Sequence, residues 1–237
     1  MARSNSYSRQ WFEFFHDSIG EERTSREAEF ICQVAPLPGF RRLLDVCCGN
    51  GRHARALSAR GYSVTGIERD AVAITKARGL GGGPEYIEAD VRDYEATKAE
   101  FDLAIVMSQS FGYFDAGTNR ELLRRLAANV RSGGRIILDV WNPEFFTSHV
   151  GERVLDMPAG KVREHKRVND GRLIVRLTYP DGNEESFDWQ LFTPTEMESL
   201  AGSVGLSLEK TCANFNPATI PTAGDARLQF VLERRSR

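Results

Sequence analysis

The sequence lacks an excess of either charge, since it has 31 lysine and arginine residues and 33 aspartate and glutamate residues among 237. A chain so close to neutral has no overall field to attract nucleic acid or an anionic membrane surface. It also lacks an apolar run long enough to span a bilayer, and residues 1–15 contain no apolar core of a signal peptide. We therefore expect a cytoplasmic protein with no nucleic-acid partner and no membrane partner.

Cysteine is scarce as well. The four residues Cys32, Cys47, Cys48 and Cys212 follow neither a metal-ligand spacing nor a disulfide framework. Cys47 and Cys48 are adjacent inside a predicted buried strand, where a thiol behaves as a small apolar residue. We therefore predict no metal site and no redox pair. Internal repeats and low-complexity segments are also missing, and a chain of this length is expected to form one domain, or one domain with an inserted piece.

The chain is organised around residues 43–60. A short apolar run ends at Gly49 and Gly51 and passes into helix-forming residues that stop before Gly61. This pattern predicts a buried strand, a tight turn and a helix. Glycine permits positive φ and lets a ligand approach the backbone, while the helix N-terminus presents unpaired N–H groups. The stretch therefore indicates a site for a small molecule that carries oxygen atoms.

Apolar strands alternate with helices up to Trp141, which predicts a parallel sheet covered on both faces and hence a doubly wound α/β fold. The strands are expected at residues 42–48, 63–68, 85–89, 101–107 and 135–141. Three S/T-x-x-E capping boxes are predicted to open helices, and the second of these helices is expected to end at Gly133-Gly134. The capping boxes lie at residues 24–27, 118–121 and 193–196.

The pattern changes after Trp141. Residues 153–190 alternate with period two and are interrupted by turn signals at 169–171 and 180–183, so we predict a small antiparallel β insertion. A helix and strands at 206–211 and 227–233 follow, and these two strands can pair antiparallel because no helix separates them. The predicted parts are an N-terminal helical cap (1–40), a cofactor-binding core (41–142), a β insertion or flap (143–192) and a C-terminal helix with core strands (193–237).

Acidic residues fall at the ends of the first three predicted strands. Glu68 lies 17 residues past Gly51, where a carboxylate can accept both hydrogens of a ribose diol. Asp90 can accept from the exocyclic amine of adenine, with the Val91 N–H at a ring nitrogen, and Asp45 suits an ammonium group. Glu68 or Asp90 alone could instead cap the following helix. Because the carboxyl edge of an open α/β sheet is where ligands bind, their common placement favours an adenosine-type ligand.

Together these motifs resemble the class I S-adenosylmethionine-dependent methyltransferase family over roughly residues 40–142. The residues that carry the resemblance are 44–53, 66–68, 88–91, 101–103, 110–114 and 131–135. The resemblance implies a Rossmann-like sheet of seven strands, mostly parallel with the last strand antiparallel, and S-adenosylmethionine as cofactor. The chain departs from the family at Cys47, where glycine is usual.

The resemblance also assigns roles within the cofactor site. Gly49 and Gly51 would lie against the methionine part, Glu68 would hold the ribose, and Asp90 with Val91 would meet the adenine. Met107 and Ser108 would lie near the transferred methyl group. Trp11, from an N-terminal aromatic cluster, is a further candidate for contact with the cofactor.

Methyl transfer from a sulfonium is an in-line displacement, in which the protein aligns and desolvates the reactants. A sulfonium cation favours aromatic faces. The aromatic residues at 11–15 and 111–114 are therefore candidates for a lid and an acceptor pocket, and Tyr113 is the best placed of them. No general base is evident, and His16, His53, His149 and His165 are candidates by residue type only. His149 and His165 lie near or in the insertion and could face the acceptor, and His149 is taken as the second catalytic candidate. We expect a small-molecule N- or O-acceptor and a monomer or homodimer.

Three alternatives remain at this point. A nicotinamide-dependent dehydrogenase would need glycine where Ala54 stands and would not predict Asp90. An aminopropyl transferase would share the fold, but no acidic polyamine site is evident. A non-catalytic module that binds an adenosyl ligand stays open. The fourth strand also lacks the Asn/Asp-Pro-Pro-aromatic signature of enzymes that methylate bases or glutamine amides.

Overall fold

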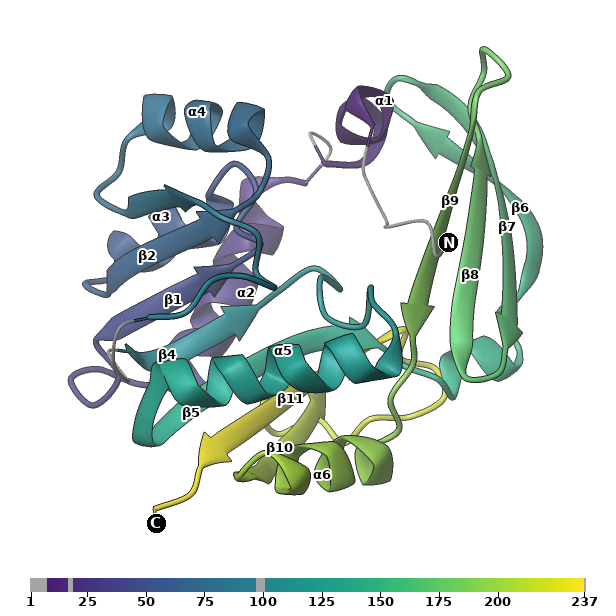
Figure 1. Ribbon diagram of the computed structural model, residues 1–237. Coiled ribbons are helices and arrows are strands. Elements are labelled where there is room, and N and C mark those ends of the chain that lie inside the picture. The colour runs from purple at the N-terminus through teal and green to yellow at the C-terminus, as the bar shows by residue number, and fades with distance from the viewer. Residues whose placement is uncertain (1–7, 17–18, 97–100, 237) are drawn as a thin grey trace.

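The computed structural model describes residues 8–16, 19–96 and 101–236 (Figure 1). Its main sheet has seven strands in the order β10-β11-β5-β4-β1-β2-β3. The strands are β1 (Arg42–Val46), β2 (Ser63–Glu68), β3 (Glu85–Glu88), β4 (Phe101–Val106), β5 (Val130–Trp141), β10 (Leu206–Ala213) and β11 (Arg227–Arg234). β11 is antiparallel to both of its neighbours, and the pairings from β5 to β3 are parallel. The predicted fold class is confirmed.

Helices cover both faces of this sheet. The helices of the main domain are α2 (Glu21–Val34), α3 (Arg52–Ser58), α4 (Ala71–Leu80), α5 (Ala116–Asn129) and α6 (Pro194–Ser203). Successive strand residues point to opposite faces, so Leu43 and Leu103 pack in the core layer of α2, α3 and α4, whereas Leu44 and Ala104 pack in the layer of α5 and α6. In Figure 1, α5 passes in front of the sheet and α2 behind it. No helix in the described part of the chain combines the length and apolar character needed to cross a bilayer.

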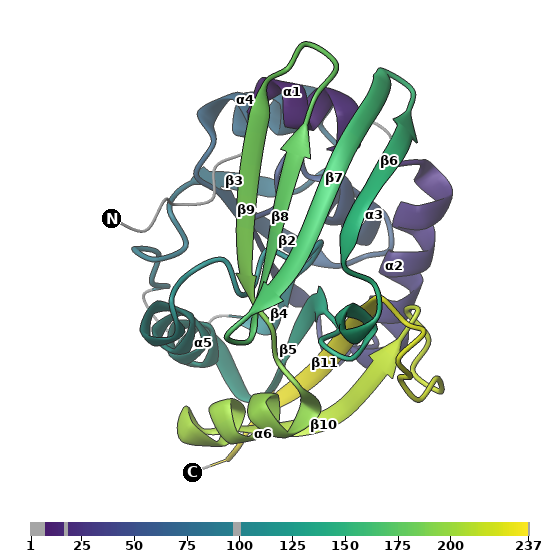
Figure 2. The same ribbon diagram turned by 90° about the vertical axis from the view of Figure 1, so that its right-hand side faces the viewer.

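A second sheet of four antiparallel strands forms the predicted insertion, which we call the flap (residues 151–190). Its strands are β6 (Gly151–Met157), β7 (Gly160–Asn169), β8 (Arg172–Thr178) and β9 (Glu184–Gln190). Both predicted turns are confirmed, and Asp170 and Gly171 adopt the positive φ of a tight hairpin, at 47° and 70°. Figure 2 shows the flap standing in front of the main sheet.

The N-terminal segment, residues 8–15, lies against the tip of the flap. It contains the short helix α1 (Arg9–Trp11) and most of a π-helical turn, Phe12–His16. The Ser8 N–H donates to Glu185 Oε1 at 3.0 Å, and the rings of Phe14 and Tyr179 pack edge to face with centroids 5.3 Å apart. In each of these contacts the two residues are more than 160 positions apart in the sequence, so no local pattern could predict the contact.

One of the three predicted capping boxes is confirmed. The side chain of Thr193 accepts from the Glu196 N–H at 3.2 Å, Glu196 Oε2 accepts from the Thr193 N–H at 2.8 Å, and Pro194 occupies the first turn of α6. The other two predictions are wrong. Thr24 lies inside α2, which begins at Glu21, where acidic residues in the first turn complement the helix dipole.

The start and the end of α5 also differ from the prediction. Asp115, not Thr118, is its N-cap, because the Asp115 carboxylate accepts from the Thr118 N–H at 3.0 Å. The helix ends at Asn129, and Gly133-Gly134 lie within β5. The described part of the β3–β4 connection, residues 89–96, forms turns, so the expectation of a helix between all successive strands is not met there.

Candidate active site

The turn between β1 and α3 has a left-handed backbone at three residues. Cys47, Gly49 and Gly51 have φ values of 58°, 55° and 76°. The positive φ of Cys47 explains why glycine, which adopts this backbone conformation readily, would be usual at residue 47. A Cβ on Gly51 would lie 2.2 Å from the hydroxyl oxygen of Tyr86, so glycine is needed here for close packing. Gly49 is the glycine that faces the adjacent cavity.

This cavity has a volume of about 570 Å³ and lies at the carboxyl ends of β1, β2 and β4. Its size is ordinary for a small-molecule or cofactor site. Most of the residues predicted for the site line it together, namely Trp11, Asp45, Gly49, Glu68, Asp90, Val91, Met107, Ser108 and Tyr113. Gly51 and His149 do not line it. Gly51 instead packs against the Tyr86 ring. The surroundings of His149 are described below.

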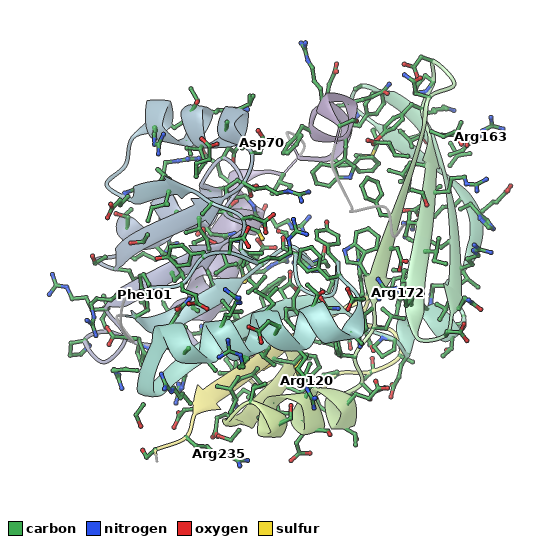
Figure 3. All side chains as sticks on the ribbon, in the orientation of Figure 1. Asp70, Phe101, Arg120, Arg163, Arg172 and Arg235 are labelled. Carbon is green, nitrogen blue, oxygen red and sulfur yellow. The ribbon has the colours of Figure 1, made fainter. Side chains whose placement is uncertain are left out.

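Glu68 is held in a fixed orientation at the end of β2. Its Oε2 accepts from the Gly49 N–H at 3.2 Å, and its Oε1 accepts from the N–H groups of Arg69 and Asp70 at 2.8 and 3.0 Å. The helix cap of α4 is a different residue, Asp70, which lies at the start of this helix (Figure 3). Its carboxylate accepts from the Val72 N–H at 2.8 Å. The alternative role of Glu68 as a helix cap is therefore wrong, and its carboxylate remains at the cavity wall.

Asp90 is oriented by Arg92, which the sequence analysis missed. The guanidinium donates to both carboxylate oxygens, at 2.9 and 2.6 Å, and the Arg92 N–H donates to Oδ1 at 2.9 Å. This hydrogen bonding lowers the pKa of Asp90 to about 2. The carboxylate is therefore an ionised acceptor at neutral pH. The Asp-x-Arg spacing is the local signal that could have identified the pair.

Asp45 is a buried carboxylate with an unused acceptor. It is 1% exposed, and its Oδ2 has no hydrogen-bond partner although it lies at the cavity. Burial, partly opposed by the charge of Arg52, raises the pKa of Asp45 to about 7. A buried acceptor without a donor is costly, so this position fits an ammonium group supplied by a ligand.

Arg52 lines the cavity beside Asp45 and was also missed. Its guanidinium pairs with the fully buried Glu27 at 2.5 Å and donates to Ser108 Oγ at 2.8 Å. A cation in the first turn of a helix opposes the helix dipole, and this conflict was the available signal for a special role. Asp45 and Arg52 together place opposite charges where the sequence predicts the amino-acid part of the cofactor.

Aromatic side chains also line the cavity. Trp11 and Phe12 reach it from the N-terminal segment, and Tyr113 and Phe114 reach it from the loop after β4 together with Ser110. The Tyr113 ring packs against Trp189 of the flap, with centroids 5.3 Å apart. Burial raises the pKa of Tyr113, so its phenol stays neutral and acts as a wall or hydrogen-bonding group, not as a base.

Of the histidine side chains that the structure describes, His53 lines the cavity, whereas His149 and His165 do not. His149 stacks on Phe145, with ring centroids 3.8 Å apart, and its side chain is exposed. Burial and the charge of Arg52 lower the pKa of His53 to about 4, and its Nε2 contacts Glu27 at 2.8 Å. His165 is exposed on the outer face of the flap, next to Arg163 and Glu164 along β7, and the His16 side chain falls outside the described part.

Comparison with known proteins agrees with this geometry. A methyltransferase-domain family matches residues 43–134. A dTDP-3-amino-3,6-dideoxy-alpha-D-glucopyranose N,N-dimethyltransferase from Streptomyces fradiae is 26% identical over 212 residues, which are 84% of this chain and 83% of that protein. Glycine N-methyltransferase from Oryctolagus cuniculus is 24% identical over 160 residues, 60% of this chain and 54% of that one.

Solved structures share the fold across nearly the whole chain. An S-adenosylmethionine-dependent methyltransferase from Clostridium acetobutylicum superposes with a TM-score of 0.78 at 14% identity, covering 96% of this chain and 97% of that one. The sugar N-methyltransferase KedS8 from Streptoalloteichus gives 0.74 at 20% identity, covering 100% and 98%. Residues 43–134 thus carry a methyltransferase domain, and the chain as a whole is similar to S-adenosylmethionine-dependent methyltransferases. It is a methyltransferase, and its cofactor is S-adenosylmethionine.

The raised pKa of Asp45 predicts a pH-dependent affinity for this cofactor. If only the ionised carboxylate pairs with the cofactor ammonium, protonation below pH 7 removes the binding-competent form. The dissociation constant for S-adenosylmethionine should then rise roughly eightfold between pH 7.5 and pH 6. Calorimetric titration across this range measures the effect, and the Asp45→Asn variant should bind more weakly without the pH dependence. A wild-type affinity that stays constant from pH 7.5 to pH 6 would contradict this role for Asp45.

Proposed function

We propose that this enzyme methylates an amino nitrogen on a small polar molecule, with amino sugars as the first class to test. The observation that carries the proposal is the distribution of charge around the cavity. The acidic and basic residues and the histidine among its lining come from β1, β2 and α3 and from the segments after β2 and β3, on the side that we assign to the cofactor: Asp45, Arg52, His53, Glu68, Arg69, Asp70 and Asp90.

The acceptor side contrasts with this arrangement. We assign to it the aromatic rings of Trp11, Phe12 and Tyr113 and the hydroxyl of Ser110, whereas the Phe114 ring lies next to Arg92, the partner of Asp90. A hydroxyl acceptor would need a base to take its proton in the transition state, whereas an amine that binds unprotonated already offers a lone pair. The relatives from Streptomyces fradiae and Oryctolagus cuniculus are named as N-methyltransferases, which supports the same choice.

The site residues would each contribute a positioning role in this reaction. When bound, S-adenosylmethionine supplies a methyl group activated on a sulfonium. We propose that Glu68 holds the ribose, and that Asp90 and Val91 meet the adenine. Asp45 and Arg52 would take the ammonium and carboxylate of the amino-acid part. Fixing both reactants in line is worth roughly 7–11 kcal/mol in well-oriented reactions.

Two other groups would complete the site. Met107 and Ser108, at the end of β4, would border the transferred methyl group. The rings of Trp11 and Tyr113 would exclude water and present π faces to the cationic centre. These assignments make the aromatic side the determinant of the acceptor and the charged side the determinant of the cofactor.

The proposal predicts a strong preference for an amine over the matching alcohol. A nucleotide-linked amino sugar, the same compound with hydroxyl in place of the amine, glycine and trans-aconitate would be compared by formation of S-adenosylhomocysteine. We expect methylation of an amine, with the hydroxyl counterpart at least about 100-fold slower because no base assists it. Preferential methylation of the alcohol or of trans-aconitate would contradict the proposal, and a Glu68→Ala sample supplies the background rate.

A further inference from the structure

The loop after β4 carries a backbone conformation that needs support. Ser108 and Gln109 have φ values of 55° and 60°, although neither is glycine. Two consecutive left-handed residues with side chains persist only where the surrounding structure holds them. This turn begins the loop that delivers Ser108, Ser110 and Tyr113 to the cavity. Whatever holds the turn therefore sets the geometry between the cofactor side and the acceptor side.

Asp139 of β5 provides this support. Its carboxylate is fully buried, and Oδ2 accepts from the Ser108 N–H and from Gln109 Nε2, each at 2.9 Å. Its backbone carbonyl accepts from the Gln109 N–H at 3.0 Å. One residue thus makes three hydrogen bonds to the two left-handed residues, while Asp139 itself does not line the cavity.

Residues of β11 contact both oxygens of the Asp139 carboxylate, since Arg227 Nη2 donates to Oδ2 as well. Oδ1 accepts from Gln229 Nε2 at 2.9 Å and from Arg227 Nε at 3.0 Å. Arg227 also reaches Glu27 of α2 at 3.4 Å. A guanidinium and several polar hydrogens therefore surround this buried carboxylate and compensate for its removal from water.

The chain of contacts returns to the turn through α3. Glu27 pairs with Arg52 at 2.5 Å, and Arg52 Nη2 donates to Ser108 Oγ at 2.8 Å. Although burial alone would raise the pKa of Glu27, its contact with His53 and the charges of Arg52 and Arg227 hold that pKa well below its usual range. The closed set of Ser108, Asp139, Arg227, Glu27 and Arg52, which we call the Asp139 network, therefore balances two carboxylates against two guanidinium groups.

The flap also contacts the turn at Ser108 and Gln109, through Trp189 of β9. The indole N–H of Trp189 donates to the Gln109 carbonyl at 3.0 Å, and the Trp189 ring packs against Tyr113. Three parts of the molecule therefore meet at Ser108 and Gln109: the main sheet through Asp139, α3 through Arg52, and the flap through Trp189.

We propose that Asp139 is a positioning residue for methyl transfer. Through the Asp139 network it holds the turn at Ser108 and Gln109 so that the aromatic acceptor wall stays aligned with the cofactor. The prediction for Asp139→Asn is a specific loss of rate: the single-turnover rate at saturating substrates falls at least tenfold, while the calorimetric dissociation constants for S-adenosylmethionine and S-adenosylhomocysteine stay within threefold of wild type.

Two further variants separate positioning from general stability. Gln229→Met removes a donor from the same carboxylate without touching the turn, so it should lower the melting temperature but leave the single-turnover rate within about twofold of wild type. Adding Gln109→Gly to Asp139→Asn should recover part of the rate, because glycine adopts the left-handed backbone without support. If Asp139→Asn does not fold, Arg227→Lys tests the same network, with the same pattern of reduced rate and retained cofactor affinity.

The rate measurement depends on the proposed amine acceptor, so amide hydrogen exchange of the cofactor-bound protein is followed as well. Exchange across residues 107–112 should be at least tenfold faster in Asp139→Asn than in wild type. An unchanged rate, unchanged exchange, or a rate loss that follows cofactor affinity and is not recovered by Gln109→Gly would overturn the inference. Failure of wild type to methylate any amine would overturn the proposed acceptor, while the exchange result would still decide the role of Asp139.

Discussion

Replacement of Gly51 by valine is expected to abolish measurable binding of S-adenosylmethionine. The new Cβ would lie 2.2 Å from the Tyr86 hydroxyl oxygen and 2.7 Å from its ring carbon Cζ, and the φ of 76° is a conformation that a β-branched residue rarely adopts. The left-handed backbone alone costs roughly 1–2 kcal/mol, and the overlap adds to this. Relief requires the turn or the buried Tyr86 ring to move, and we expect the turn to yield and to displace Gly49 and Arg52 from the cavity wall.

Calorimetry of the purified Gly51→Val variant tests this expectation, with circular dichroism to verify that the fold is retained. Gly79→Ala is the matched control, because a Cβ there meets nothing within 4 Å and the residue lies within α4. The control should bind the cofactor normally and gain up to about 1 kcal/mol in the free energy of unfolding. Normal cofactor binding by Gly51→Val would show that the turn does not shape the site.

Replacement of Glu68 by glutamine is expected to weaken binding of S-adenosylmethionine by one to two orders of magnitude. Hydrogen bonds to a charged group contribute about 1.5–3 kcal/mol each, and the proposed ribose contact uses this carboxylate. Glutamine keeps the size of the side chain but replaces one acceptor oxygen with a donor. Because Glu68 also accepts from the Gly49, Arg69 and Asp70 N–H groups, Glu68→Ala should lose more affinity than Glu68→Gln.

Glu88→Gln serves as the control for this experiment. Glu88 pairs with Glu68 in the register of β2 and β3, yet it is exposed and does not line the cavity. Titration with S-adenosylmethionine should therefore give a wild-type dissociation constant for Glu88→Gln. Equal affinities for wild type and Glu68→Ala would remove Glu68 from the cofactor site.

Local sequence patterns predicted the parts of the molecule whose causes are local. Apolar runs located the strands from β1 to β5, and turn residues located the flap hairpins, because these features depend on residues close together in the chain. The strand-end acids met at one cavity, since the carboxyl ends of parallel strands share an edge. Helix starts were predicted less reliably. The S/T-x-x-E sequence at residues 24–27 lies inside α2, and the one at residues 118–121 follows the true N-cap of α5, Asp115.

The missed features depend on contacts between distant elements. Arg227 and Asp139 are 88 residues apart, and Glu27 and Arg227 are 200 apart, so no window of the sequence contains the Asp139 network. The contact of the N-terminal segment with the flap is equally remote. His149 was proposed from residue type and approximate position alone, and its stacking on Phe145 depends on a turn that the sequence analysis did not anticipate.

The separation between the two sides of the cavity has an evolutionary consequence. The charged wall is built by the β1–β3 region, whereas the aromatic wall is built by the N-terminal segment and the loop after β4, with the flap behind it. Mutations can therefore accumulate in the aromatic wall and change which compounds are accepted while the methyl donor is retained.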